Sequence, residues 1–345
     1  MRSTIFYMAC LVVVIAGLKA ASAIMVPMLL TIFIAIITAP GYLALQKRGI
    51  PAFLALIIMV LLMGVFVFFG IEFFAKSLKG FSSNIPAYQA SLNDQLGHIW
   101  AMLEARGFEA PKDFVAEYIN PQQAISFMGG LATALSGTLA KTLLIFIVVI
   151  FILLETTTLP KKIKSIEGVD DEAWKRLSRT VEDVRKYLSL KTLMSLLTGI
   201  LVAIWLSFMG VDYPVLLGVI AFMLNYVPSI GSIIASIPGV LLAFVQFGVG
   251  PASIVMIGYI VVNIGVSNLI EPRFFGKGFG VSPLIIIFSM IFWGWVFGPV
   301  GMLLSVPLTM TVKVALEANP RTHWVAILMG QEPEEDLHDE KDKNQ

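Results

Sequence analysis

Long apolar stretches recur along the chain, and polar segments separate them. Because a backbone inside lipid must satisfy its own hydrogen bonds, apolar stretches of nearly twenty residues predict membrane-spanning helices. The clearest stretches are residues 5–18, 24–45, 53–74, 139–154, 193–208 and 252–270. The pattern therefore predicts an all-α integral membrane protein, built as a polytopic helical bundle.

Two polar segments, residues 76–138 and 156–191, keep apolar residues at helical spacing. The second is rich in cations: Lys161, Lys162, Lys164, Lys175, Arg176, Arg179, Arg185 and Lys186. The positive-inside rule places it in the cytoplasm. Residues 76–138 then form a small extracytoplasmic helical insert, and both chain ends face the cytoplasm. The amphipathic part of 156–191 should pack against a neighbouring subunit or the membrane-facing core.

These assignments divide the chain into six parts. They are N-terminal transmembrane helices in 1–75, an extracytoplasmic insert in 76–138, a transmembrane helix in 139–155, a cytoplasmic amphipathic segment in 156–191, a transmembrane core in 192–316, and a cytoplasmic acidic tail in 317–345. The core contains two unusual apolar stretches, 214–247 and 283–316.

Both unusual stretches are longer than one membrane crossing needs, and proline and glycine interrupt each of them. The interrupting residues are Asn225, Pro228, Ser229 and Gly231 in the first stretch, and Gly294, Gly298, Pro299, Gly301 and Pro307 in the second. Proline removes an amide donor and glycine permits unusual backbone geometry, so the helices should break there. The pattern predicts two broken, re-entrant hairpins whose free backbone groups line protein or water. Ordinary kinked helices are the alternative.

A polar face ends the span at 252–270. Asn263, Ser267, Asn268 and Glu271 follow one another at spacings of four, one and three residues, which predicts a shared helical face. Together with the Asn225–Gly231 interruption, these residues are our candidates for a transport path. Glu271 either coordinates a cation or exchanges a proton, or it lies at the cytoplasmic interface paired with Arg273 or Lys277.

Composition supports the membrane assignment. Of 345 residues, 57% are hydrophobic and 14% are charged, and the net charge of +1 provides no basic field for nucleic acid. Cys10 is the single cysteine, so an intramolecular disulfide is excluded. Residues 2–23 resemble a secretory signal, but Lys19 interrupts the apolar run and a second span follows directly. We therefore expect an uncleaved helix.

The residue inventory argues against an enzyme. The three histidines, His98, His323 and His338, all lie outside the predicted spans, so a catalytic or metal-binding histidine cluster at membrane depth is not expected. The sequence Gly-Lys-Gly at 276–278 lacks the spacing of a phosphate-binding loop. We expect no cofactor and no metal site.

The second half of the chain resembles the autoinducer-2 exporter (AI-2E) family of bacterial membrane proteins. The resemblance rests on Tyr187, Lys191, Gly199, Gly210, Val211, Pro214, Leu217, Gly218, Asn-Tyr-Val-Pro at 225–228, Gly231, Ile237, Pro238, Asn263, Asn268, Ile-Glu-Pro at 270–272, Gly276, Pro283, Trp293, Gly294, Gly298, Gly301 and Pro307. It implies a homo-oligomeric inner-membrane transporter with the 225–231 break, Asn263, Asn268 and Glu271 around the path.

Members of that family are associated with export of autoinducer-2, and others with exchange of sodium or lithium for protons. The expected function is therefore a secondary transporter or exporter of a small, autoinducer-2-like solute across the inner membrane. A sodium(lithium)/proton antiporter, a passive channel and an oligomeric membrane scaffold remain alternatives. The expected partners are membrane lipid, a small molecule or ion, and further copies of the chain.

Overall fold

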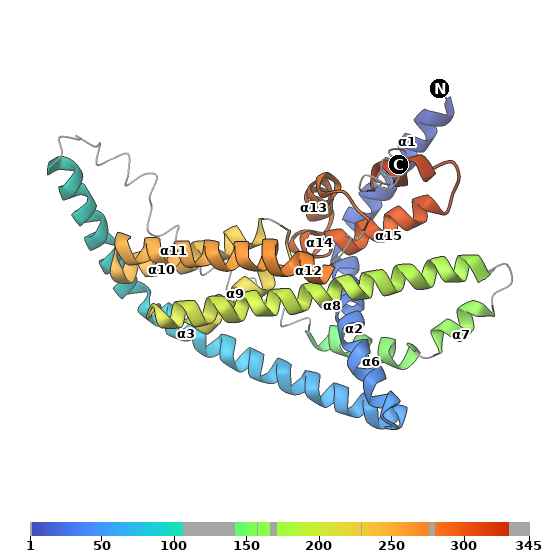
Figure 1. The fold of residues 1–345 in the computed structure, drawn as a ribbon, viewed down its shortest axis with the longest axis horizontal. Coiled ribbons are helices and arrows are strands. Elements are labelled where there is room, and N and C mark those ends of the chain that lie inside the picture. Colours follow the sequence, from blue (N-terminus) through green and yellow to red (C-terminus); the bar gives the residue numbers. More distant parts are fainter. Residues whose placement is uncertain are drawn as a thin grey trace, which may run out of the picture.

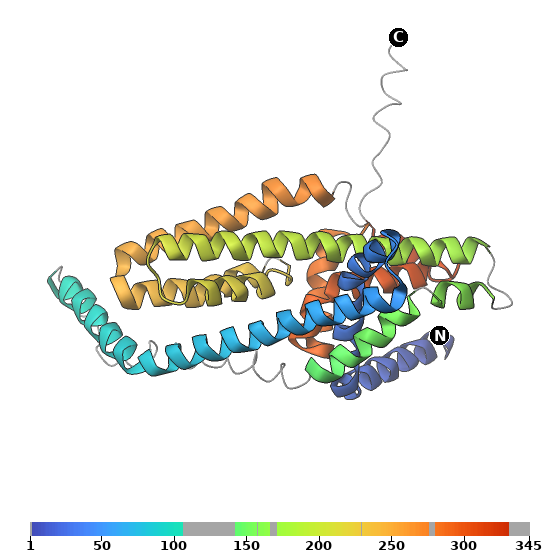
Figure 2. The same cartoon turned by 90° about the horizontal axis from the view of Figure 1, so that it is seen from below.

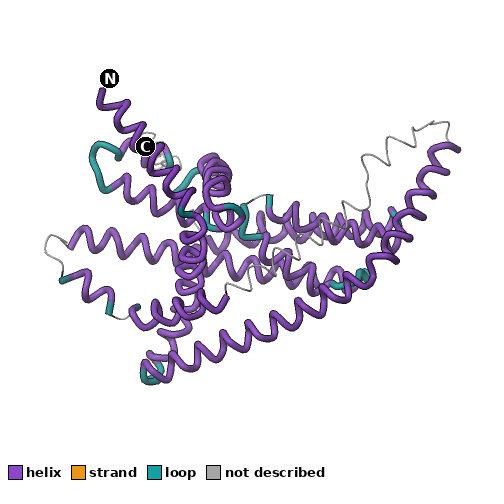
Figure 3. Tube along the Cα trace, turned by 180° about the vertical axis from the view of Figure 1, so that it is seen from behind, coloured by secondary structure: helices purple, strands orange, loops and turns teal. Residues whose placement is uncertain are grey.

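The computed structural model describes residues 2–105, 142–156, 158–165, 171–228, 230–275 and 280–330, and every regular element within these ranges is a helix (Figures 1 and 3). Four of the described helices are long and apolar enough to cross a membrane: Ser22–Lys47, Ala52–His98, Ser178–Phe208 and Val249–Phe274. The predicted all-α membrane protein is confirmed. The predicted cytoplasmic tail after residue 330 lies outside the described residues.

The first group of helices forms a small bundle of its own. It contains α1 (Arg2–Ala20), α2 (Ser22–Lys47), the start of α3 (Ala52–Ala105) and α6 (Thr142–Glu155). Tyr42 of α2, Ala55 of α3 and Leu153 of α6 are almost fully buried against one another. Burial of these apolar side chains fixes α6 beside α2 and α3.

Helix α3 continues past the predicted end of its membrane span. It runs to Ala105, so it passes without a break through residue 76, where the polar insert was predicted to begin. The polar side chains end the apolar stretch but not the helix, which continues even through Pro86. Residues 106–141 of the predicted insert lie outside the described residues.

The far part of α3 packs against α10 (Gly231–Phe247). Figure 2 shows α3 running alongside the group of helices that contains α10. Phe81, Tyr88 and Leu92 belong to the largest buried cluster. The Tyr88 hydroxyl donates a hydrogen bond of 2.7 Å to Oδ2 of Asp212. This contact joins α3 to the loop that follows α8 (Asp171–Phe208).

Tyr88→Phe is expected to lower the free energy of unfolding by about 1.5 kcal/mol, because the change removes a hydrogen bond to a charged acceptor. Thermal unfolding of the purified protein in detergent measures the effect. Asp212→Asn keeps an acceptor for Tyr88 and should lose less stability. Equal stability of Tyr88→Phe and the unmodified chain would show that this contact does not hold α3 in place.

Helix α8 connects the two halves of the molecule (Figure 1). It is continuous from the predicted cytoplasmic segment into the predicted membrane core. Val184 and Leu188 are buried against Val306 and Met310 of α15 (Ser305–Glu317). This part of the amphipathic face therefore packs within the same chain. The short α7 (Leu159–Lys164) precedes α8.

The first interrupted stretch forms α9 (Pro214–Leu224) and α10 (Gly231–Phe247), which pack together and break at residues 225–230. Helix α9 approaches α8 very closely: a Cβ atom on Gly218 would lie 2.6 Å from the carbonyl oxygen of Gly199 and 2.7 Å from Cβ of Ala203. Two glycines thus let the two backbones touch. The break coincides with the predicted one; its depth in the membrane stays a prediction.

The second interrupted stretch forms α13 (Pro283–Phe297), α14 (Pro299–Leu303) and α15. The chain turns at Gly298, whose φ of 67° favours glycine, and again at Leu304. Gly294 lies inside α13 and Pro307 inside the first turn of α15, so the turns fall between these two residues. The short α16 (His323–Leu328) follows.

Candidate functional site

One face of α8 carries three polar side chains deep in the protein. Lys191, Ser195 and Thr198 are spaced by four and three residues, so they share a face of the helix. All three are buried, with Ser195 fully so. By the rise of an α-helix, this face is about 10 Å long. Lys191 and Ser195 each bind a side chain from another part of the chain, and Thr198 lines a small pocket.

Lys191 forms an ion pair with Glu271. Its Nζ lies 2.8 Å from Oε1 of Glu271, and the two side chains are only 9% and 19% exposed. The buried Tyr187, one turn before Lys191, is close enough to Glu271 to interact with its charge. Arg273, a predicted partner of Glu271, is exposed, and Lys277 lies outside the described residues. Among the described residues, the carboxylate is therefore paired across the bundle with Lys191 and not with Arg273.

The helix that carries Glu271 changes form just before it. Helix α11 (Val249–Ile264) becomes a π-helical turn over Gly265–Ile270, and α12 (Glu271–Phe275) continues it. The span that the sequence pattern ends at residue 270 therefore continues as a helix as far as Phe275. The wider turn accommodates Pro272, which lacks the amide hydrogen that a regular turn would use.

The predicted polar residues of this helix do not all lie on its buried side. Ser267 donates a weak hydrogen bond of 3.4 Å to Oδ1 of Asn263, and both are partly buried. Asn268 is exposed. The structure thus brings Asn263, Ser267 and Glu271 to the interior side of the helix and leaves Asn268 outside it.

The break of the first hairpin contacts the same face of α8. The buried Asn225 donates from Nδ2 to Oγ of Ser195 at 3.1 Å. The next residue, Tyr226, donates to Oγ1 of Thr192 at 2.7 Å and packs edge-on against Phe33 of α2. These contacts hold the break against α8 and α2.

The other predicted residues of the break lie nearby in the chain. Pro228 is partly buried and Gly231, the first residue of α10, is fully inside the protein. Ser229 lies outside the described residues.

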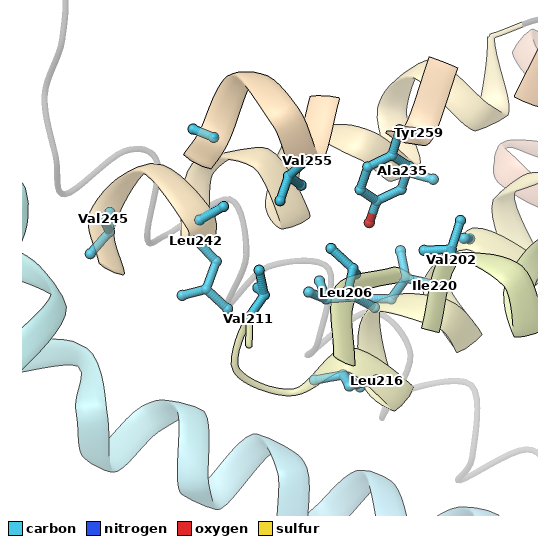
Figure 4. Close-up of a cluster of buried hydrophobic side chains, with 14 of the residues drawn as sticks. Val202, Leu206, Val211, Leu216, Ile220, Ala235, Leu242, Val245, Val255 and Tyr259 are labelled. Carbon is cyan, nitrogen blue, oxygen red and sulfur yellow. The ribbon is translucent and has the colours of Figure 1, made fainter. Parts of the chain in front are cut away.

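A small pocket lies beyond Ser195 on the same face. Its lining includes Thr198 of α8, Ser232 of α10, and Tyr259 and Asn263 of α11. Figure 4 shows the Tyr259 ring directed from α11 into the buried cluster, toward the helices that carry Leu206 and Ile220. We refer to Lys191, Ser195, Thr198, Asn225, Tyr259, Asn263 and Glu271 as the polar seam.

Sequence reasoning missed three members of the polar seam: Ser195, Thr198 and Tyr259. Lys191 was noted for its family resemblance but not as a partner of Glu271. The signal was present, because Lys191, Ser195 and Thr198 recur at helical spacing inside an apolar stretch.

The predicted residues of the second hairpin lie apart from the polar seam. Gly294 packs against Met302, and Trp293 donates a hydrogen bond of 3.0 Å to Thr309 within the same hairpin. This hairpin contacts α8 through Val306 and Met310, near Val184 and Leu188 and so before Lys191 in the chain. Gly298, Pro299, Gly301 and Pro307 shape this hairpin and do not line the seam.

The chemistry of the polar seam is that of hydrogen bonding around one ion pair. Glu271 is its single carboxylate, and no three His, Cys, Asp or Glu side chains gather anywhere in the described ranges. The remaining groups are hydroxyls and carboxamides. Such groups can replace the water shell of a small polar solute inside an apolar bundle.

Comparisons with known proteins show the family to which the chain belongs. The model of the AI-2E family transporters matches residues 8–321. The AI-2 transport protein TqsA of Escherichia coli K12 is 34% identical over 319 residues, which cover 92% of this chain and 93% of that protein. A protein of Haemophilus influenzae named as a predicted transport protein is 35% identical and covers 96% of this chain and 97% of its own length. The chain therefore belongs to the AI-2E family of multi-pass membrane transporters.

Proposed function

We propose that the polar seam is the solute path of this transporter and that the Lys191–Glu271 ion pair closes one end of it. The observation that carries the proposal is this ion pair, which is mostly buried in an otherwise apolar bundle. Ionisable groups inside membrane bundles are expensive and are usually functional. For a solute to pass this end of the seam, the two side chains have to separate.

The groups of the polar seam favour a small uncharged solute. The ammonium of Lys191 and the carboxylate of Glu271 balance each other, and the other groups are neutral hydrogen-bonding side chains. The E. coli relative is named as a transport protein for AI-2. We therefore propose export of an autoinducer-2-like solute, driven by a coupled ion gradient.

Sodium(lithium)/proton antiport is the second candidate. Glu271 supports it, because a carboxylate that is 19% exposed remains within reach of a proton or cation when its ion pair opens. In this case Glu271 carries the exchanged ion. In export of an autoinducer-2-like solute, by contrast, Glu271 only opens and closes the path.

The deciding measurement is flux in proteoliposomes of the purified protein, with autoinducer-2 efflux and sodium-linked proton movement recorded in parallel. We expect autoinducer-2 to move against its gradient and Glu271→Gln to reduce the rate at least tenfold, because the variant leaves Lys191 without a charged partner. Glu72→Gln is the matched control, since it removes a carboxylate from an exposed ion pair with Lys76.

Each alternative predicts a different outcome of the same measurement. Sodium-linked proton movement that Glu271→Gln abolishes would establish the antiporter. Passive autoinducer-2 flux would indicate a channel, and no flux of either kind would indicate a scaffold. Equal autoinducer-2 transport by Glu271→Gln and by the unmodified protein would remove the ion pair from the mechanism.

We also propose the setting in which this transport takes place. The cations of residues 156–191 support an inner-membrane location with both chain ends in the cytoplasm. Large apolar side chains exposed on α2, α3 and α11, such as Ile24, Phe66 and Val261, support contact with lipid and with further copies of the chain.

A further inference from the structure

The hydroxyl of Tyr259 is one of five buried side-chain groups without a hydrogen-bond partner in the described part of the chain, and Tyr259 is the one that also lines a pocket. The residue is only 6% exposed, and its Oη atom has no hydrogen-bond partner among the described residues. A buried hydroxyl without a partner is destabilising, so one that persists in a protein points to an occupant that completes it. Tyr259 is one of the residues that line the small pocket next to the α8 face.

The position of this hydroxyl is set by α10. A Cβ atom on Gly239 would lie 2.4 Å from Oη of Tyr259, so the phenol fits only because this position of α10 has no side chain. Close backbone approach thus directs the ring into the cluster of Figure 4. The tyrosine is held in place by packing and not by a hydrogen bond.

The other polar groups of the pocket define what it can accept. Thr198 already donates its hydroxyl hydrogen to the carbonyl oxygen of Met194 at 3.0 Å, so its oxygen is free to accept. Asn263 uses Oδ1 to accept from Ser267, and its amide hydrogens point to no acceptor in the described part of the chain. The pocket therefore offers both donors and acceptors within one small space.

The charge and the size of the pocket further restrict the kind of group that it can bind. The residues that line the pocket are Thr198, Val202, Ala221, Ser232, Ala235, Tyr259, Val262 and Asn263, and none of them is ionisable at neutral pH. The free space suits about one water-sized group. An isolated ion would be poorly compensated here, whereas a single hydroxyl group could donate and accept at once.

We propose that Tyr259, Thr198 and Asn263 form a subsite that binds one hydroxyl group of an uncharged solute as it passes along the polar seam. The inference rests on the proposed function and adds the class of ligand. Thr198 lies seven residues after Lys191 on the same face of α8, so the subsite is about 10 Å from the ion pair. A water molecule offers the same chemistry and is the competing occupant.

A binding measurement distinguishes a solute hydroxyl from a water molecule as the occupant of the subsite. Thermal unfolding of the purified protein in detergent is measured against rising concentrations of autoinducer-2, erythritol, ribose and sorbitol. We expect a saturable rise in the unfolding temperature with at least one of these compounds. Tyr259→Phe, which removes only the hydroxyl, should weaken that binding about three- to tenfold, the usual effect of one lost hydrogen bond.

Tyr42→Phe is the matched control. Tyr42 is also buried, with 1% exposed against 6% for Tyr259, but it lies in the separate α2, α3 and α6 cluster, so loss of its hydroxyl should leave binding unchanged. Gly239→Ala offers an independent variant, because its Cβ atom pushes against the Tyr259 hydroxyl and should weaken the same compounds. The two changes reach the subsite from different helices.

The outcomes also distinguish a failure of the proposed subsite from a failure of the proposed transport function. Binding that weakens in Tyr259→Phe supports the subsite even if no flux is found in proteoliposomes, in which case the proposed function fails alone. If no compound gives a saturable shift, or if Tyr259→Phe binds as well as the unmodified protein, only water occupies the pocket. The subsite for solute is then overturned, although autoinducer-2 flux could still establish transport.

Discussion

Lys191→Met is expected to destabilise the protein by about 3 kcal/mol, because it leaves the carboxylate of Glu271 mostly buried without a partner. Glu271→Gln should have a similar effect through the unpaired ammonium of Lys191. The double variant should recover most of this loss, since neither charge remains. Reversible unfolding in mixed detergent micelles gives the three free energies, and their combination gives the coupling energy of the pair.

The exposed pair between Lys76 and Glu72 provides the control cycle. Its side chains are 76% and 44% exposed and lie four residues apart on α3, so its coupling should stay below about 0.5 kcal/mol. A coupling energy this small for Lys191 and Glu271 would contradict the view that they form a closed, desolvated contact. It would also remove the energetic basis for treating them as a gate.

A strong coupling would have a functional consequence. Two charges that are coupled by several kcal/mol have to be separated during each transport cycle, so the solute or a coupled ion must supply that free energy. The subsite at Tyr259 lies on the same seam and could contribute through binding. Unfolding free energies and transport rates of the same variants therefore provide two independent tests of whether the Lys191–Glu271 ion pair acts as a gate.

Local chemistry made the interrupted helices predictable. Pro228 and Gly231 cannot continue a regular helix unchanged, and α9 does end at Leu224 while α10 begins at Gly231. The same reasoning located the turn at Gly298 and Pro299, but it was wrong at Gly294, Gly301 and Pro307, which lie inside α13, α14 and α15. Breaks of this kind depend on residues that are close in sequence, so a single sequence contains the information.

Contacts between distant residues were not predictable in the same way. Lys191 and Glu271 are 80 residues apart, and periodicity along one helix cannot identify a partner on another. The π-helical turn over Gly265–Ile270 has no clear sequence signature either, and Asn268 is exposed although it was predicted to share a face with Asn263 and Glu271. Tertiary packing decided both features.

In both hairpins, a glycine after the turn lies directly against the backbone of the helix before the turn. In the first, a Cβ atom on Gly231 would lie 1.8 Å from the carbonyl oxygen of Leu224. In the second, a Cβ atom on Gly301 would lie 1.9 Å from the carbonyl oxygen of Trp293. In each case the helix after the turn begins against the last turn of the helix before it. The close approach keeps both hairpins compact where their backbone is irregular.

Gly231→Ala should therefore destabilise the protein by about 3 kcal/mol, because the added methyl group meets backbone that cannot move without separating α9 from α10. Unfolding in mixed micelles measures the loss, and autoinducer-2 flux should fall with it, since Asn225 is held by the same turn. Gly301→Ala should behave alike.

Gly64→Ala is the control for these two variants. The glycine lies within α3 and nothing would lie within 4 Å of its new Cβ atom, so the change should be neutral or stabilise the helix by up to about 1 kcal/mol. If Gly231→Ala were as stable as Gly64→Ala, the turn would have to be open enough to admit a side chain. The first hairpin would then be a flexible connection, and the precise placement of Asn225 against Ser195 would lose its structural cause.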